Sequence, residues 1–300
     1  LFTSRETRAA DRSAQMSLSS AVMFVNAAYA MHTGTPPSPP PPATQTASGA
    51  KSTGDPHLSL AHGGKADFRG KDATTYAFLS APGIAVNVGV QLSNFTLNKQ
   101  RLLVHGSFFT SVYINVNNAL KVSLDASRVN DRNYAWNMLE GTCGGARVVL
   151  GPHSEHACAT ASIVTQYSST VVTAMGWSVT ATSQPVYDRV GWGGPRHRLD
   201  VHIVRDADSH TSCIHGIIGQ SFAQERRDGK LDVYPHSGEM TTSAMGEGAI
   251  DGVPDDYVVP HGYDTDFKFT MFQPTPSAME ACGHKATFKS SSAFTFSSSL

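Results

Sequence analysis

Charged residues are scarce in this sequence, and neither sign is in excess. Asp, Glu, Lys and Arg make up 16% of the 300 residues, below the roughly 25% of an average globular protein. The formal net charge is -1, from 23 Lys and Arg against 24 Asp and Glu. Without a positive field to attract phosphates, the composition disfavours a nucleic-acid partner.

Long apolar runs are also missing. No window approaches 18 consecutive apolar residues, so the sequence predicts no transmembrane helix. Leu/Glu/Lys-rich runs, which favour helices, are absent, whereas Ser, Thr, Gly and Val are abundant. This bias favours strands and turns.

The cysteines lack any Cys-x-x-Cys pair, which excludes the spacing of zinc ribbons and thioredoxin-like motifs. Two disulfides in an oxidising compartment are the simpler interpretation, with three connectivities open; four buried free thiols are the alternative. We prefer one short-range pair, because it flanks a glycine-rich turn, and one long-range pair. These are Cys143–Cys158 and Cys213–Cys282.

Two segments of different composition precede the β-rich part. Residues 1–32 place three arginines ahead of a short apolar stretch, as a secretory signal does; a short helix or the end of a preceding domain is the alternative. Residues 33–53 are a Pro/Ser/Thr-rich linker, which we expect to be an extended spacer. Its Ser38 and the four prolines that follow resemble the repeat of extensin-type wall glycoproteins, although a plain linker explains them equally.

Alternating apolar residues predict strand after strand from residue 54 to residue 300. Residues 84–90 and 199–205 alternate most regularly, and Asn117 with Asn118 predicts a hairpin turn. We therefore expect an all-β domain, an antiparallel sandwich or a barrel-like stack of sheets with few short helices. Further strands are predicted at residues 101–106, 109–116, 120–124, 170–173, 177–180 and 267–271.

Two short blocks carry a family resemblance. The first comprises Gly54, Asp55, Pro56 and His57, followed by an Asp-Phe-Arg-Gly-Lys sequence from residue 67. It resembles the entry motif of von Willebrand factor type D-like domains, closest in pattern to the root-cap-type family and the C-terminal region of inter-alpha-trypsin inhibitor heavy chains.

The second block, residues 215–222, is similar to the Gly-φ-φ-Gly-Gln-aromatic segment of these relatives, with Gly216, Gly219 and Gln220 as its motif residues. The resemblance implies one such domain over residues 54–300. We expect residues 54–70 to form its first strand and turn, with residues 216–222 as their packing partner.

The resemblance does not carry over a metal site. Type D domains bind calcium through an acidic residue soon after the entry motif and an Asn/Asp-rich loop after the second block. This chain has His62, Gly63 and Gly64 at the first place, and two arginines within residues 221–229 at the second. Calcium needs several oxygen ligands at once. We predict no cofactor, with calcium left as an open alternative. The family's Cys-Gly-x-Cys spacing is absent too, and with it the implied covalent multimerisation.

The entry motif is also a candidate site. Asp55, His57 and His62 are close in sequence, and His215 from the second block could complete a metal or acid–base cluster. The alternative, which we favour, is that Asp55 and Pro56 form a turn while His57 donates a hydrogen bond beneath the sheet.

Three other candidate sites have plainer interpretations. His153 and His156 have a spacing that can chelate zinc or copper, but an exposed loop explains them. Ser221 lacks the strand-to-helix setting of a nucleophile elbow. Cys213 beside His215 suggests thiol catalysis, but a disulfide cysteine is not a nucleophile.

The remaining candidates concern glycans and cations. Asn94 begins an N-glycosylation sequon. Trp192 could stack on sugar from an exposed loop, although we prefer a core-capping aromatic. Residues 247–257 carry several carboxylates and form a candidate weak cation site, with a solvated loop as the preferred alternative.

Taken together, these features predict a secreted, non-catalytic structural or adhesion module of a cell-surface or matrix assembly. We expect it to contact extracellular protein or glycan through loops and sheet edges, and to take part in a larger filament or matrix. Two alternatives remain open. One is a metal-assisted hydrolase at Asp55, His57 and His215, and the other is a carbohydrate-binding module that uses Trp192.

Overall fold

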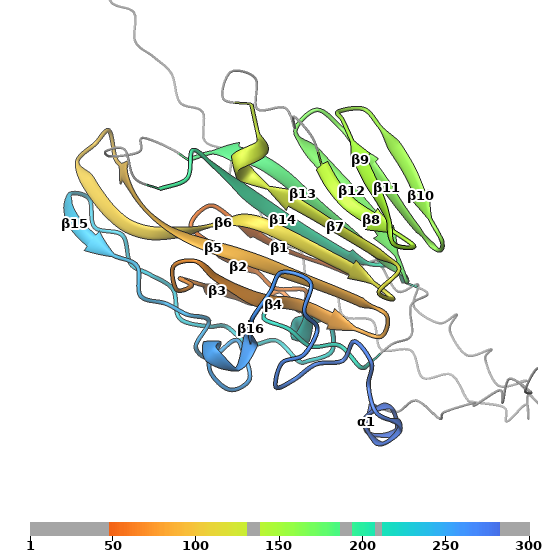
Figure 1. Cartoon of the computed structure of the whole chain (residues 1–300). Coiled ribbons are helices and arrows are strands. Elements are labelled where there is room, and N and C mark those ends of the chain that lie inside the picture. The colour runs from red at the N-terminus through yellow and green to blue at the C-terminus, as the bar shows by residue number, and fades with distance from the viewer. Residues whose placement is uncertain (1–47, 131–138, 187–193, 208–211, 283–300) are drawn as a thin grey trace, which may run out of the picture. The chain divides into compact units, whose positions relative to one another are not determined.

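The computed structural model describes residues 48–130, 139–186, 194–207 and 212–282. Over these residues the chain forms two large, mostly antiparallel sheets that pack against each other (Figure 1). The predicted all-β sandwich is therefore confirmed. The candidate residues Ser38 and Trp192 lie outside the described residues, as do residues 1–32.

The first sheet has eight strands within the described residues, and its middle is a pair of long strands, β13 and β14. Their neighbours on one side are β12, β11 and β10, and on the other β1, β2 and β3. The strands are β1 (Ser48–Thr53), β2 (His57–Ser59), β3 (Lys65–Asp67), β10 (Glu155–Cys158), β11 (Ala161–Thr165), β12 (Ser169–Ala174), β13 (Trp177–Pro185) and β14 (His197–Arg205).

The second sheet follows the order β16-β4-β5-β6-β7-β8-β9, with β15 joined in parallel to β6. Its longest strands, β5 and β6, pair along their whole length. The strands are β4 (Thr74–Ala81), β5 (Ile84–Leu97), β6 (Leu102–Val116), β7 (Leu120–Asp125), β8 (Leu139–Cys143), β9 (Ala146–Leu150), β15 (Gly238–Thr241) and β16 (Val258–Val259).

Helical structure is limited to short turns in the described part of the chain. Three are single 3₁₀ turns: η1 (Ala126–Arg128), η2 (Gly219–Phe222) and η3 (Pro254–Tyr257). The α-helix α1 covers Pro276–Ala281. None of these helices is long and apolar enough to span a bilayer.

The core lies between the two sheets, where alternate residues of facing strands meet. Leu199, Val201 and Ile203 of β14 are almost fully buried, whereas Asp200 and His202 are not, as their alternation predicts. Trp177 is 1% exposed and meets the ring of Phe222 edge-on at 5.0 Å.

An aromatic cluster fills the space beneath β4. Edge-on ring pairs, which are favourable beyond their buried area, join Phe68 to Tyr76 at 5.2 Å and Phe78 to Phe109 at 5.3 Å.

The hairpin prediction at Asn117 and Asn118 is confirmed. Both residues have positive φ, 49° and 57°, and they join β6 to β7. Asparagine tolerates this left-handed conformation better than most residues, and two such residues give a turn whose twist matches that of the strands.

One linker prediction and one strand prediction need correction. The predicted linker, residues 33–53, does not extend to Thr53, because Ser48–Thr53 forms β1 and pairs with both β14 and β2. Residues 267–271 form turns and loop rather than a strand. Their alternating phenylalanines pack on Tyr257 instead, at ring distances of 6.0 Å for Phe267 and 5.4 Å for Phe269.

Disulfides join distant parts of the fold. Cys143 in β8 of the second sheet bonds to Cys158 in β10 of the first sheet, so the two sheets are covalently linked. Cys213 bonds to Cys282 just after α1. These are the two pairs that the sequence favoured.

Candidate functional site

The entry motif forms the turn between β1 and β2. Gly54 has a φ of +72°, a conformation natural to glycine, and its N–H donates to Asp200 Oδ1 at 3.1 Å. Asp55 and Pro56 complete the turn, and Thr53 of β1 then pairs with His57 of β2. The Asp-Pro turn expected from the sequence is therefore present.

His57 lies between two carboxylates. Its Nδ1 is 2.7 Å from Asp67 Oδ1, and its Nε2 is 3.1 Å from Asp55 Oδ1. The carboxylates are well buried, with side chains 10% and 7% exposed for Asp55 and Asp67, whereas the imidazole is 46% exposed. Hydrogen bonds to Asp55 and then Asp67 raise the pKa of His57 to about 10. The ring is thus an imidazolium at neutral pH, with both N–H groups donated.

The other oxygens of these carboxylates are also bound. Asp55 Oδ2 accepts a hydrogen bond from the Tyr234 hydroxyl at 2.5 Å, and Asp67 Oδ2 accepts one from the backbone N–H of Asp232 at 2.8 Å. Burial, followed by the charge of Asp55, raises the pKa of Tyr234, so its proton stays in place. The entry cluster, meaning Asp55, His57, Asp67 and Tyr234, therefore binds the segment after β14 to the first sheet.

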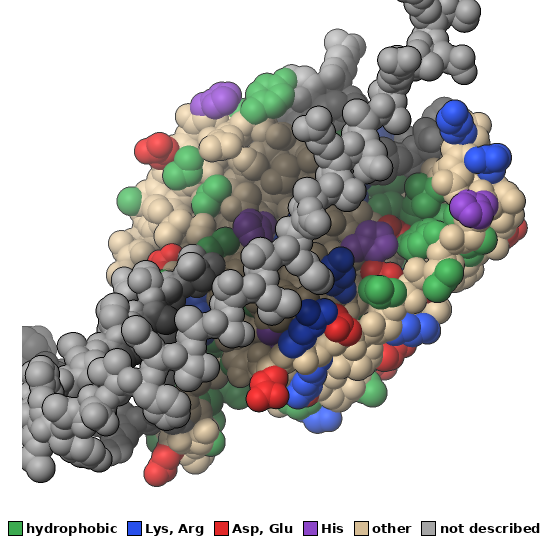
Figure 2. All heavy atoms as spheres, turned by 180° about the vertical axis from the view of Figure 1, so that it is seen from behind, with side chains coloured by type: hydrophobic (Ala, Val, Ile, Leu, Met, Phe, Trp, Pro, Cys, Tyr) green, Lys and Arg blue, Asp and Glu red, His purple; other side chains and the backbone are tan. Residues whose placement is uncertain are grey.

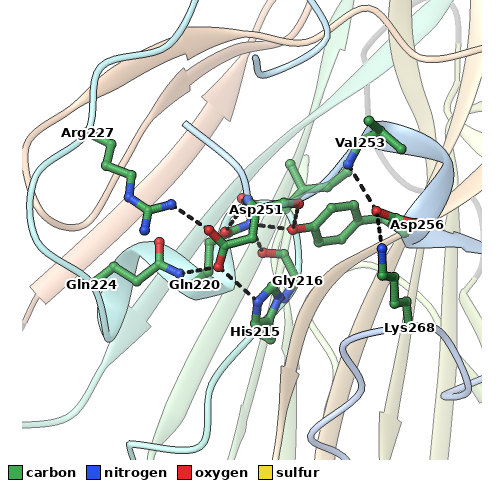
Figure 3. Close-up of polar contacts among 11 residues, drawn as sticks. His215, Gly216, Gln220, Gln224, Arg227, Asp251, Val253, Asp256 and Lys268 are labelled. Atoms are coloured by element: carbon green, nitrogen blue, oxygen red, sulfur yellow. Dashed lines mark hydrogen bonds and ion pairs between the residues drawn. The ribbon is translucent and has the colours of Figure 1, made fainter. Parts of the chain in front are cut away.

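A second polar cluster surrounds His215 (Figure 3). The residue forms a β-bridge with Ser80 of β4, and its ring stacks on Phe269 at 4.6 Å and on Tyr257 at 5.9 Å. Its Nε2 is 3.4 Å from Asp251 Oδ2. Burial lowers the pKa of His215 despite the opposing charge of Asp251.

Asp251 is the centre of this second cluster. Burial would raise the pKa of its carboxyl, but hydrogen bonds from Arg227 Nη1 at 2.5 Å and Gln224 Nε2 at 2.7 Å hold that pKa below its ordinary value. Its backbone N–H donates to Gln220 Oε1, and Gln220 Nε2 donates to Gly216 O and to the Tyr257 hydroxyl, each at 2.9 Å. The buried glutamine of the second block thus joins its own turn to residues 251–257.

The two sequence blocks meet, as the sequence predicted. The Ala61 N–H donates to Ser221 Oγ at 3.0 Å, which joins the end of the entry stretch to η2. The second block is bound more extensively to β4, where Ile217 and Ile218 donate to Ala77 O and Phe78 O at 3.0 Å. Ser221 Oγ also donates to Ile218 O at 2.7 Å, so this buried hydroxyl has a structural role.

The metal candidates are not assembled into one site. Asp55 and His57 share the entry cluster, whereas His215 contacts Asp251 instead. His62 lies apart in the turn after β2, where its Nδ1 accepts from the Gly64 N–H at 3.2 Å. Within the described residues, no three or more His, Cys, Asp or Glu side chains are placed to hold a metal ion.

The other histidine pair is divided as well. His153 lies in the loop before β10, with its ring 6.4 Å from that of Tyr167, and His156 lies on β10 itself. Cys213 is bonded to Cys282 rather than facing His215 as a thiol.

The acidic stretch at residues 247–257 does not converge on a cation. Glu247 accepts from a backbone N–H, and Asp251 belongs to the cluster around His215. Asp255 and Asp256 pair with Lys71 and Lys268 at 2.6 and 2.9 Å. Each carboxylate therefore has a partner within the protein.

Asn94 lies within β5 and is exposed at its surface. Its Oδ1 is 2.7 Å from His105 Nδ1, and His105 Nε2 is 2.6 Å from Glu239 on β15. Because the histidine holds Asn94 by its oxygen, the amide nitrogen that would carry a glycan is not used in this contact.

Sequence reasoning missed four residues of these clusters: Asp67, Tyr234, Tyr257 and Phe269. Only Asp67 could have been recognised from the sequence, because a carboxylate between two apolar residues in a short strand indicates a buried polar contact. The others come from loops far along the chain, and nothing local marks them as partners of His57 or His215.

Comparison with known proteins does not assign the chain to a family. No family model matches the chain, and no curated protein matches it.

Proposed function

We propose that this chain is a secreted, non-catalytic β module of a cell-surface or matrix assembly, related to von Willebrand factor type D-like domains. In this role it contacts extracellular protein or glycan, and the proline-rich segment before it serves as a spacer. The relationship rests on the entry motif and the second block, which the fold brings into contact.

One observation carries the non-catalytic role. Both ring nitrogens of His57, the most reactive residue of the entry motif, donate to carboxylates of the same domain. An imidazolium with two donated N–H groups has no lone pair to offer a metal ion or a substrate proton. The cluster is therefore suited to fixing a junction rather than to acid–base chemistry.

An extracellular setting is supported by the disulfides, since such bonds persist in oxidising compartments. One of them joins the two sheets, and the other closes the segment that contains Tyr234 and the cluster around His215. This covalent bracing is typical of domains that work outside the cell.

The surface offers features suited to contact. β9 and β10 are edge strands of the two sheets, and free strand edges are able to pair with a partner. Leu231 and Val233, 51% and 87% exposed, present apolar side chains beside the entry cluster. Figure 2 shows acidic and basic side chains interspersed on one face, so recognition there would depend on local contacts.

Mass spectrometry of the native protein tests this function. We expect the pairs Cys143–Cys158 and Cys213–Cys282, a glycan at Asn94, and glycan or hydroxyproline near Ser38. Free thiols together with an unmodified proline-rich segment would overturn the proposal.

The competing hydrolase hypothesis predicts a different result. If Asp55 and His57 held a catalytic metal, the dialysed protein would retain stoichiometric zinc, and His57→Ala would lose it. We expect instead that wild type and His57→Ala bind no zinc at stoichiometric level. His105→Ala, which removes another carboxylate-bound histidine, is the matched control.

A further inference from the structure

Two adjoining hollows form one polar groove on the second sheet. The larger, about 890 Å³, lies between β5, β6 and η1 on one side and residues 194–197, at the start of β14, on the other; the smaller, about 270 Å³, lies against β4, β5 and β6. They adjoin because Gln91, Thr110 and Ser111 line both of them. We refer to the combined feature as the β5–β6 groove.

A β-bulge gives the groove its floor. Phe109 and Val112 of β6 both point into the core, at 1% and 0% exposure, so strict alternation cannot hold between them. The pairing of β5 with β6 shifts register at Gly89, which leaves Thr110 as the extra residue. Thr110 and Ser111 are both half-buried and both line the groove, although they are consecutive. Bulges re-aim side chains in this way.

Gly89 deepens the groove beside the β-bulge. Gly89 pairs with Ser111, and a Cβ at position 89 would lie 3.2 Å from the Ser111 Cβ. The missing side chain therefore leaves the two hydroxyls beside it uncovered.

The groove presents hydrogen-bonding groups that the protein does not use. Across the described residues, the side chains of Gln91, Thr110 and Ser111 make no hydrogen bond or ion pair. The acidic residues at its margins are fixed, because Asp72 Oδ1 accepts from the Leu92 N–H and Asp125 Oδ1 accepts from the Ser127 N–H, each at 2.8 Å. The groove therefore has fixed carboxylate acceptors at its margins and, in its middle, hydroxyl and amide groups without a partner among the described residues.

The lining selects among ligand classes. Two carboxylates, Asp72 and Asp125, line the groove along with a single guanidinium, Arg196, so the charge does not suit phosphate or sulfate. The floor consists of β5 and β6, interior strands that each pair with a neighbour on both sides, which excludes strand addition by a peptide. Hydroxyl and amide side chains both donate and accept, and they match a ligand rich in hydroxyls.

From these features we propose that the β5–β6 groove binds a neutral polysaccharide chain. Tyr113 is half-buried, with its ring packed against Gly262 and edge-on to Tyr263 at 5.5 Å; the part of the ring that lines the smaller hollow is available for contact with a sugar ring. The inference rests on the proposed function, since it names the class of one extracellular partner.

Isothermal titration of the secreted full chain tests the groove, with neutral hexasaccharides of glucose, xylose and mannose as probes. We expect at least one to bind. Gln91→Ala combined with Ser111→Ala should weaken that binding about 25-fold, because each lost hydrogen bond costs about fivefold. Ser111→Trp should abolish it by filling the floor.

The matched control removes two hydroxyls from the other sheet. Ser162 on β11 and Thr173 on β12 are exposed cross-strand partners outside the groove, and their double alanine variant should bind as wild type does. Thermal unfolding of every variant establishes that it folds.

Three outcomes would overturn the inference. They are failure of all neutral hexasaccharides to bind at millimolar concentration, binding that the groove variants leave unchanged, and tighter binding of a sulfated hexasaccharide or of an extended proline-rich peptide. Disulfide mapping on the same sample separates the two proposals. Intact disulfides without sugar binding would contradict the groove alone, whereas free thiols would contradict the extracellular function.

Discussion

Replacing His57 by glutamine tests whether the entry cluster holds the fold together. An imidazole whose pKa rises from 6.5 to about 10 nominally gains about 5 kcal/mol for its charged form. The side chain is 46% exposed, and solvent screening reduces this value, so we expect His57→Gln to lose about 2 kcal/mol of unfolding free energy at pH 7. The loss arises because Asp55 and Asp67 would face each other without a cation between them.

The pH dependence gives the sharper test. A histidine whose pKa is raised on folding stabilises the folded state fully below pH 6.5, and this contribution is lost as the pH rises towards 10. The difference between wild type and His57→Gln should therefore be largest near pH 6.5 and shrink steadily up to pH 10. Urea unfolding followed by tryptophan fluorescence at four pH values measures it.

His105→Gln provides the matched control. His105 also contacts a carboxylate, but its partner Glu239 is 66% exposed, and exposed ion pairs contribute little. We expect a loss below about 1 kcal/mol. A difference for His57→Gln that stays constant between pH 6.5 and 10, or one no larger than that of His105→Gln, would refute the electrostatic account of the cluster.

Three further changes probe the fold. Gly216→Ala should lower the unfolding free energy by about 3 kcal/mol in thermal unfolding, because φ is +106° and the new Cβ would lie 2.6 Å from a backbone oxygen of β4. The control Gly144→Ala, which has open space around it, should lose only about 1 kcal/mol. Replacing Cys143 and Cys158 by serine should lower the unfolding free energy by about 3 kcal/mol, whereas no change in the urea midpoint would contradict the bracing role. Tyr234→Phe should cost about 1–2 kcal/mol. It should also raise the pKa at which His57 titrates by NMR, because Asp55 would lose a hydrogen-bond donor and carry more negative charge beside the imidazole; an unchanged titration would place the hydroxyl outside the network.

Local pattern was sufficient to predict much of the fold. Leu199, Val201 and Ile203 alternate, and β14 buries them as expected. The local pattern failed for segments whose secondary structure is determined by long-range contacts. Ser48–Thr53 resembles a linker in composition, yet small residues such as Ala50 and Ser52 fit the buried face beside β14. Phe267 and Phe269 alternate like a strand, but they pack on Tyr257 from turns.

The candidate site was predictable only in part, for the same reason. Asp55 and His57 are two residues apart, so their contact follows from local geometry. Tyr234 reaches Asp55 from 179 positions along the chain, and no local signal specifies that approach. The β5–β6 groove depends on a register shift opposite Gly89, which alternation rules cannot anticipate because they assume that none occurs.

The long-range disulfide has a mechanical consequence. Cys213 and Cys282 are 69 positions apart, and the chain between them would span roughly 230 Å if fully extended. When the module is pulled along its chain, tension passes directly from one cysteine to the other. The intervening loop, which carries Tyr234 and Asp251, bears no load. The contacts made within this loop, such as those of Asp251 with Gln220, Gln224 and Arg227, can therefore persist under forces that would extend the strands before it.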